Sequence, residues 1–202
     1  MVERNAVLER RRSPLQRMTR ELEAGSSAAV SLREIPFLAQ IGLRAEAGSP
    51  SAVALEWTLT GALPEGVGDV TELSGGRHVL WLAPDEYLLV APDEATGGTD
   101  PAAITEELST ALGGLPGQVV DLSANRTTLE LRGPRAQEVL DKSCRLDLDP
   151  VAFPAGSALV TLLGTVNVIL WRVAPDTWRI MPRASFATHT ARWLLDGMRE
   201  FA

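Results

Sequence analysis

An internal repeat constrains the fold of this chain more than any other feature of its sequence. The segment Ala83–Val90, which begins Ala-Pro-Asp, matches Ala174–Met181 at an offset of 91 residues, and Leu43-Arg44 matches Leu131-Arg132 at an offset of 88. In each Ala-Pro-Asp, proline presets φ and aspartate can bond its own backbone, so both are predicted to be tight turns that lead into a strand. Because copies of one supersecondary unit usually bury their apolar faces against each other, we expect two halves packed as one body.

The elements predicted within each copy indicate an α+β fold. Each half reads as strand, helix, strand, strand and helix, and the two halves are expected to be related by a pseudo-twofold axis. We assign residues 1–30 to a basic N-terminal arm and linker, and residues 31–202 to a single folded body. Its two repeat halves are expected at about 31–114 and 115–202, divided after the helix that Gly113 ends.

Hydrophobic periodicity and turn residues place the individual elements. Alternating or short apolar runs predict strands at 37–44, 78–82, 86–91, 119–122, 127–132, 158–163, 166–173 and 178–181. Helices are predicted after the cap residue Asp100, from Pro134, where the missing N–H of proline is no loss, and from Ser185. Pro50–Leu59 stays ambiguous, because its proline favours a helix start while its threonine favours a strand.

The size and composition of the chain are those of a globular protein. A chain of 202 residues can bury about 70% of its unfolded surface, which is enough for a core without disulfides. The single cysteine, Cys144, excludes an internal disulfide and indicates a reducing compartment. No apolar run approaches the roughly 20 residues that span a bilayer, and the first residues lack the apolar core of a secretion signal. We therefore expect a cytoplasmic protein with no membrane partner.

Charge is distributed unevenly along the chain. Residues 1–20 hold six arginines and two glutamates, a net charge of +4, and since the whole chain carries −7 the remainder carries −11. The acidic body argues against a nucleic-acid partner. The arm is interpreted either as a frayed tail or as a segment that lies on an acidic partner surface, and we predict the second for residues 1–24.

Residues that could carry chemistry are sparse. Cys144 lies between Lys142 and Arg145, whose charges could lower its pKa. No catalytic signature surrounds this cysteine, and the only histidines are His78 and His189. Two isolated histidines and one cysteine form no recognisable zinc site, and the chain has no glycine-rich phosphate loop. We therefore expect no catalytic, metal-binding or cofactor-binding residue on this chain.

The order of several motifs resembles a known family. Asp121-Leu122-Ser123, followed by the apolar and glycine residues up to Leu148, resembles the opening motif of the aminomethyltransferase fold of the glycine-cleavage system. A narrower resemblance within that fold rests on three further segments, Ser31–Glu34, Pro84–Leu89 and Arg183–Phe186. Over roughly residues 30–198 the chain is most similar to the gamma subunits of heterotetrameric sarcosine oxidase.

That resemblance implies a folate-domain-like fold within a larger complex. Such a complex oxidises sarcosine to glycine with oxygen, producing hydrogen peroxide, and with tetrahydrofolate it yields 5,10-methylenetetrahydrofolate. The resemblance places FAD, FMN, NAD and zinc on the alpha, beta and delta subunits, which would be the partners of this chain. The Asp-Asp pair of aminomethyltransferases falls at Val168-Ile169, and aliphatic side chains cannot carry a proton, so a non-catalytic structural subunit is expected.

Two other functions remain open. One is a stand-alone folate-dependent enzyme of the aminomethyltransferase fold. The other is the equivalent subunit of a related dehydrogenase that acts on another N-methyl amino acid, because the substrate pocket would lie on another chain.

The residues expected to contact partner subunits are arginines and a tryptophan, since both types are enriched at binding hot spots. They are Arg10, Arg11, Arg12, Arg17, Arg126 and Trp193. Arg126 belongs to a polar cluster with Asp121 and Asn125, interpreted either as turn-stabilising or as a subunit contact. The other four tryptophans are expected mostly in the core, and any that reaches the surface is a further candidate.

Overall fold

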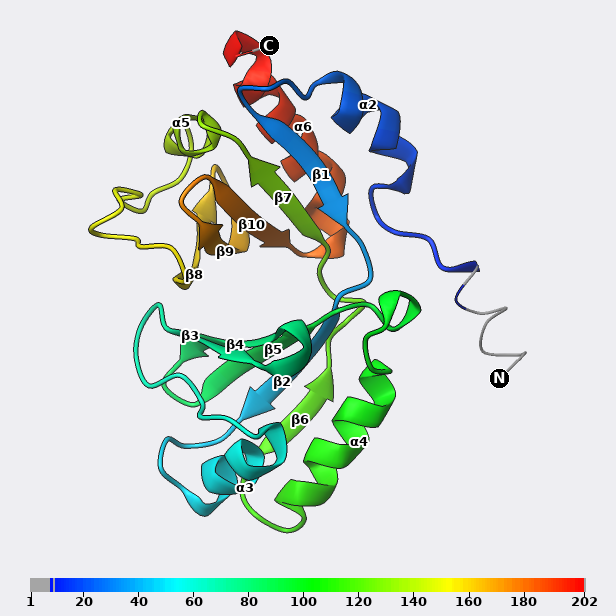
Figure 1. The fold of residues 1–202 in the computed structure, drawn as a ribbon, viewed down its shortest axis with the longest axis vertical. Helices are drawn as coiled ribbons and strands as arrows, with labels where there is room; N and C mark the ends of the chain where they lie inside the picture. The colour runs from blue at the N-terminus through cyan, green and yellow to red at the C-terminus, as the bar shows by residue number, and fades with distance from the viewer. Residues whose placement is uncertain (1–7, 9, 202) are drawn as a thin grey trace.

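A computed structural model describes residue 8 and residues 10–201 of the chain (Figure 1). The α-helices in this part are α2 (Thr19–Ala24), α3 (Pro50–Leu59), α4 (Pro101–Leu112), α5 (Ala136–Asp141) and α6 (Ala187–Met198). The strands are β1 (Ser31–Ile35), β2 (Ala39–Arg44), β3 (Val70–Leu73), β4 (Arg77–Ala83), β5 (Glu86–Ala91), β6 (Gln118–Asp121), β7 (Thr128–Arg132), β8 (Ala158–Leu163), β9 (Val166–Ala174) and β10 (Thr177–Pro182).

These strands form two five-stranded sheets whose neighbours all run antiparallel. One sheet has the order β3-β4-β5-β2-β6 and the other the order β8-β9-β10-β7-β1. The second order repeats the first, with β8, β9, β10 and β7 in the places of β3, β4, β5 and β2. The expected α+β fold with two similar halves is therefore confirmed.

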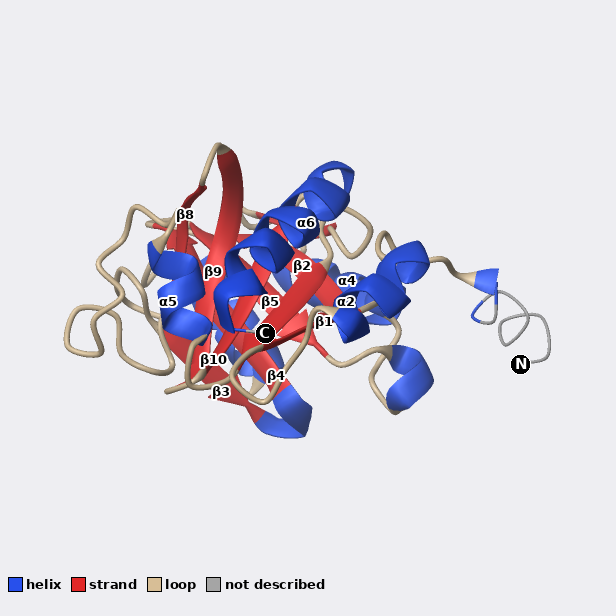
Figure 2. Ribbon diagram, turned by 90° about the horizontal axis from the view of Figure 1, so that it is seen from above, coloured by secondary structure: helices blue, strands red, loops and turns tan. Residues whose placement is uncertain are grey.

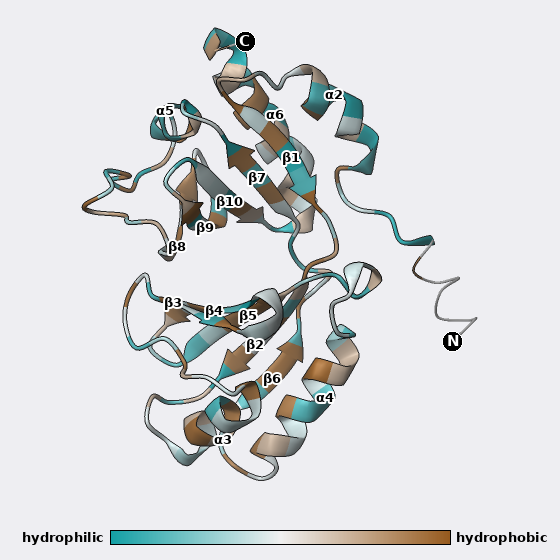
Figure 3. Ribbon diagram, viewed as in Figure 1, coloured by the Kyte–Doolittle hydropathy of each residue, from teal (hydrophilic) through white to brown (hydrophobic). Residues whose placement is uncertain are grey.

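The two sheets lie face to face between two layers of helices (Figures 1 and 2). The helices α3 and α4 cover the outer face of the first sheet, and α2, α5 and α6 cover that of the second. A third apolar cluster joins the inner faces of the sheets through residues such as Leu80 and Leu88 on one side and Ile169, Trp171 and Met181 on the other. Figure 3 shows the strands of both sheets largely in the brown of apolar residues, as burial on both faces requires.

The two halves exchange their first strands. Strand β1 opens the first half in the chain but pairs with β7, so that Leu32 lies opposite Leu131. Strand β6 opens the second half but pairs with β2, where Leu43 lies opposite Val119. The sheets therefore do not divide where the sequence repeat does, near residue 114, and each half completes the sheet of the other.

The repeated turns confirm the prediction made from the internal repeat. Pro84-Asp85 joins β4 to β5, and Pro175-Asp176 joins β9 to β10. Each turn is also bound by the same tertiary hydrogen bond, because the N–H of Ala45 donates to the carbonyl oxygen of Asp85 (3.1 Å) and that of Gly133 to the carbonyl oxygen of Asp176 (2.9 Å). The repeat thus extends to the contacts between its elements.

The structure settles one ambiguous helix and differs from the predicted start of another. The ambiguous segment Pro50–Leu59 is helical, because Ser49 caps it by accepting a hydrogen bond from the N–H of Ala52 (3.2 Å) and proline occupies the first turn. The helix expected from Pro134 begins instead at Ala136. Arg135 has φ −103° and ψ 5°, outside the helical region, and its N–H donates to the carbonyl oxygen of Ala29 (3.1 Å).

Residues 15–24 belong to the folded body rather than to an arm or linker. Leu15, Met18 and Leu22 are 0%, 6% and 3% exposed and lie in the core beneath the second sheet. They recur at intervals of three and four residues, which places them on one face of the helical segment that leads through α2. The rest of this segment is polar, as the teal of α2 in Figure 3 shows.

A row of polar and aromatic side chains crosses the second sheet on its inner face. Arg33, Glu130, Arg179 and Trp171 are neighbours on β1, β7, β10 and β9. Arg33 Nε donates to Glu130 Oε1 (2.8 Å), and the guanidinium carbon of Arg179 lies 4.7 Å from the centre of the Trp171 ring. His78 of the first sheet meets that ring edge-on at 4.8 Å, and burial together with the charge of Arg179 lowers the pKa of His78. The row therefore joins the sheets through the imidazole of His78.

Candidate subunit-contact surfaces

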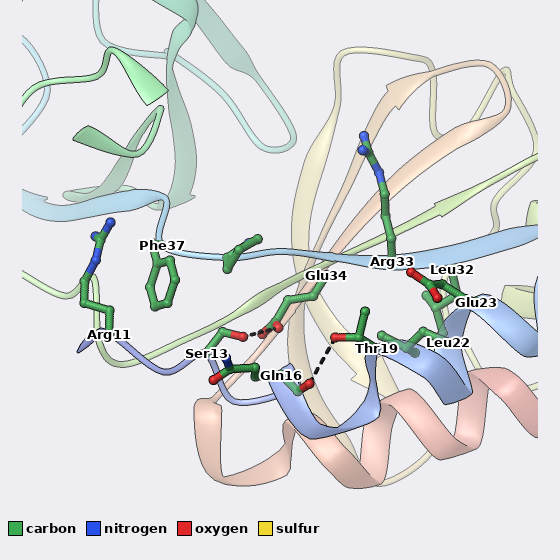
Figure 4. Close-up of a pocket in the computed structure, with 11 residues that line it drawn as sticks. Arg11, Ser13, Gln16, Thr19, Leu22, Glu23, Leu32, Arg33, Glu34 and Phe37 are labelled. Atoms are coloured by element: carbon green, nitrogen blue, oxygen red, sulfur yellow. Dashed lines mark hydrogen bonds between the residues drawn. The ribbon is translucent and has the colours of Figure 1, made fainter. Parts of the chain in front are cut away.

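The N-terminal segment is held where the two halves meet, through one carboxylate. Glu34, near the end of β1, accepts hydrogen bonds from the hydroxyls of Ser13 (2.6 Å) and Thr127 (2.6 Å) and from the N–H of Leu15 (3.3 Å). Figure 4 shows this carboxylate at the side of a hollow of about 330 Å³ between the segment and β1. Glu34 thus connects the N-terminal segment to the strands of the second sheet.

Arg11 connects the same segment to the first half of the chain. Its guanidinium donates to both carboxylate oxygens of Asp93 at 2.8 and 3.0 Å and lies 4.3 Å from the centre of the Phe37 ring. Glu94 adds a second, longer ion pair at 3.8 Å. One nitrogen, Nη2, makes both contacts with Asp93, and a hydrogen bond between two charged groups is stronger than one between neutral groups. Arg11, predicted to contact a partner, is therefore engaged within its own chain.

The structure brings three of the predicted contact residues together and leaves three apart. Arg11, Arg12 and Arg126 line one cavity of about 320 Å³ at the junction of the halves. Arg10 and Arg17 are exposed on the N-terminal segment. Trp193 lies on α6 and is 48% exposed, with its ring 6.2 Å from that of His189.

The polar cluster at Asp121 divides into two roles. The carboxylate of Asp121 accepts hydrogen bonds from the N–H (2.9 Å) and hydroxyl (2.6 Å) of Ser123, and the N–H of Asn125 donates to the carbonyl oxygen of Leu122 (2.8 Å). These bonds stabilise the turn after β6, as the first interpretation expects. The Arg126 side chain takes no part in them and faces the cavity instead.

A further surface residue, Trp57, was absent from the predicted contacts. Trp171 and Trp178 are 2% and 0% exposed and Trp81 is half-buried, whereas Trp57 on α3 is 86% exposed. Val53, one turn earlier on the same face, is 57% exposed. The signal in the sequence is that α3 is apolar on all sides, which is typical of a helix covered on more than one face.

The residues that could carry chemistry lie apart from these surfaces or within the core. Burial raises the pKa of the half-buried Cys144 thiol, the opposite of the effect that its cationic neighbours could have. Within residues 8 and 10–201, no group of three or more His, Cys, Asp or Glu side chains could hold a metal ion. Val168 and Ile169, which the resemblance sets at the aminomethyltransferase carboxylate pair, are 1% and 0% exposed inside β9. In the same part of the chain, no helix is long and apolar enough to cross a membrane.

The fold defines the chain as an α+β protein of two similar halves, like the aminomethyltransferases. Aminomethyltransferase T of the glycine cleavage system from Bartonella henselae shares this fold, with a TM-score of 0.60 and 20% identity over 87% of this chain and 48% of that one. Likeness at this identity concerns the fold alone.

More similar proteins identify the family. A model of the "Sarcosine oxidase, gamma subunit family" matches residues 44–200. A sarcosine oxidase subunit gamma from Arthrobacter sp. is 48% identical over 95% of this chain and 92% of its own length. A chain of the heterotetrameric sarcosine oxidase from Corynebacterium sp. U-96, solved with pyrrole 2-carboxylate, has a TM-score of 0.88 and 46% identity over 95% of this chain and 96% of that one. The chain belongs to the sarcosine oxidase gamma subunit family.

Proposed function

We propose that this chain is the non-catalytic gamma subunit of a cytoplasmic heterotetrameric sarcosine oxidase and that it serves the assembly of that complex. Its partners are the alpha, beta and delta subunits, which carry FAD, FMN, NAD and zinc. The complex oxidises sarcosine to glycine with oxygen, giving hydrogen peroxide, and with tetrahydrofolate it gives 5,10-methylenetetrahydrofolate. Support for the cytoplasmic location is the single, unpaired Cys144.

The exposed face of α3 carries the assembly role. Trp57 presents 86% of its surface to solvent, and two hollows of about 590 and 740 Å³ flank it. Val53 and Pro50 extend the apolar face, while Leu55 and Leu59 on the opposite face pack into the core. A tryptophan in this setting is typical of an interface hot spot, where a buried aromatic ring supplies much of the binding free energy.

Replacing Trp57 with serine is expected to weaken assembly by at least about 30-fold, which corresponds to about 2 kcal/mol. The measurement is the dissociation constant of the purified chain for the complex of the other subunits. Val151→Ser is the matched control, because Val151 is 92% exposed but lies in a loop away from α3. Equal affinities for wild type and Trp57→Ser would remove α3 from the interface.

The isolated chain is expected to carry no flavin and to bind no tetrahydrofolate at micromolar concentrations. The physical reason is that Val168 and Ile169 lie in the core, where aminomethyltransferases by resemblance place carboxylates. The absorbance spectrum of the purified chain measures bound flavin, and calorimetric titration with tetrahydrofolate measures folate binding. The assembled complex serves as the positive control. Yellow protein or saturable folate binding would favour the stand-alone enzyme instead.

A further inference from the structure

Arginines line part of the cavity at the junction of the halves. The hydrogen bonds of the turn after β6 do not account for their presence. The volume of the cavity is about 320 Å³, and the residues that line it include no aspartate or glutamate among those the structure describes. They are Arg11, Arg12, Pro14, Phe37, Pro101, Ser123, Ala124, Arg126 and Thr127. A cavity lined by both arginines and apolar groups suits an anion that is attached to a short apolar stem.

The charges of two of the three arginines are not neutralised within the described part of the chain. Arg11 is paired with Asp93 at 2.8 Å. Arg12 and Arg126 form no ion pair with any described carboxylate, and the backbone of Arg126 is bridged to that of another cation, Arg183. Burial and the charge of the exposed Arg183 lower the pKa of Arg126, and the charge of Glu86 opposes them. Partial burial of the Arg126 charge thus has an electrostatic cost that an incoming anion would relieve.

The polar groups around Arg126 are already in use, which leaves the guanidiniums as the free donors. The hydroxyl of Ser123 donates to Asp121 and that of Thr127 to Glu34, both at 2.6 Å. The buried side chain of Gln40 donates to the carbonyl oxygen of Arg126 (3.1 Å), which fixes the backbone beneath the cavity. Among the described residues, the polar contact of the Arg126 guanidinium is a long one, 3.5 Å, to the carbonyl oxygen of Met181. The Arg126 guanidinium is therefore available to bind an anion.

We infer that this cavity receives an acidic side chain of a partner subunit, whose carboxylate binds Arg126 and Arg12. The inference rests on the proposed function, because it supplies a second contact for the same assembly. The apolar wall made by Pro14, Phe37 and Pro101 accepts the methylene stem of the acidic residue. Arg12 and the exposed Arg10 and Arg17 extend the positive charge outward, so encounter with an acidic patch is favoured over encounter with a neutral one.

The test compares Arg126→Gln with Arg126→Lys and with the control Arg132→Gln, which removes an exposed arginine outside the cavity. Assembly with the other subunits is measured at about 50 and 500 mM salt. Interactions between charges are screened weakly at the lower concentration and strongly at the higher one. We expect Arg126→Gln to weaken assembly at least tenfold at low salt and to reduce the salt dependence. Arg126→Lys should lose less, because it keeps the charge but not the bidentate geometry, and Arg132→Gln should match wild type.

Two further measurements on the isolated chain distinguish this role from others. Arg126→Gln should leave the melting temperature unchanged or raise it, because it removes the repulsion with Arg183. A clear fall in melting temperature together with weaker assembly would show a structural role and overturn the inference. Unchanged assembly would also overturn it, and micromolar binding of inorganic phosphate or succinate that Arg126→Gln abolishes would then assign the cavity to a small anion. Failure of the wild-type chain to assemble would instead refute the proposed function.

Discussion

Removal of residues 1–24 is expected to unfold this protein at temperatures where the full chain is native. The deletion takes Leu15, Met18 and Leu22 out of the core beneath the second sheet and opens it to water. Truncation of one buried leucine to alanine typically costs about 2–5 kcal/mol, and a domain has only about 5–15 kcal/mol in total. The loss of three such side chains, and of the hydrogen bonds to Glu34, is therefore expected to remove most or all of the free energy of unfolding.

Thermal and urea unfolding of the isolated chain measure this effect, and point variants locate it. Leu15→Ala is expected to lower the free energy of unfolding by about 2–5 kcal/mol. Gln16→Ala is the matched control, because Gln16 is exposed beside it. If the deletion and the full chain unfold at the same temperature, residues 15–24 do not belong to the core. Weaker assembly by the deletion variant alone says nothing about docking, because an unfolded chain also fails to assemble.

Gly133→Ala is expected to destabilise the chain by about 3 kcal/mol or more, from backbone strain and overpacking together. Gly133 has a φ of +134°, a region that residues with a Cβ rarely adopt. A Cβ at this position would lie 2.4 Å from the carbonyl oxygen of Ala29 and 2.9 Å from the Cα of Val30. Both obstacles are backbone atoms, so β7 and the segment that leads into β1 would have to separate.

The control for this variant is Gly114→Ala, where a Cβ meets no atom within 4 Å. Urea unfolding should show a lower midpoint for Gly133→Ala and a midpoint close to that of wild type for Gly114→Ala. Native-state hydrogen exchange should also show faster exchange in β1 than in β5 for Gly133→Ala, because β1 is the strand displaced. Equal midpoints for the two variants would contradict the close approach of Gly133 to Ala29.

Local signals in the sequence predicted the elements well where the physical cause was itself local. The two Pro-Asp turns, the capped helix after Asp100 and the strands beside the turns depend on residues that are neighbours in the chain. Pro50–Leu59 was ambiguous because its proline favoured a helix and its threonine a strand, and the structure shows a helix capped by Ser49 with Leu55 and Leu59 buried. The expected start at Pro134 was wrong because Arg135, whose N–H is bonded to the distant Ala29, has a non-helical φ and ψ.

For the predicted contact residues, too, some features depend on residue type alone and others on tertiary packing. Residue type alone singled out Arg12 and Arg126, which the structure places at one cavity, and their contact with a partner stays a prediction. It could not show that Arg11 is bound to Asp93, because 82 residues separate the two. Nor could it separate Trp57, which is exposed, from Trp178, which is buried, because both lie in apolar segments and only packing decides which face of a segment is covered.

By itself, the sequence determined that this chain is a two-fold repeat of one α+β unit, since matching turns and periodic apolar residues are local properties. Only the tertiary structure decided which strand completes which sheet. Strand β1 joins the second sheet and β6 the first, because an edge strand pairs along one side only and the choice of that single neighbour depends on the path of the whole chain. Only the tertiary structure also decided that residues 15–24 belong to the folded body. Their three apolar side chains lie within a polar segment of the sequence, and the core that covers them is made by residues distant in the chain.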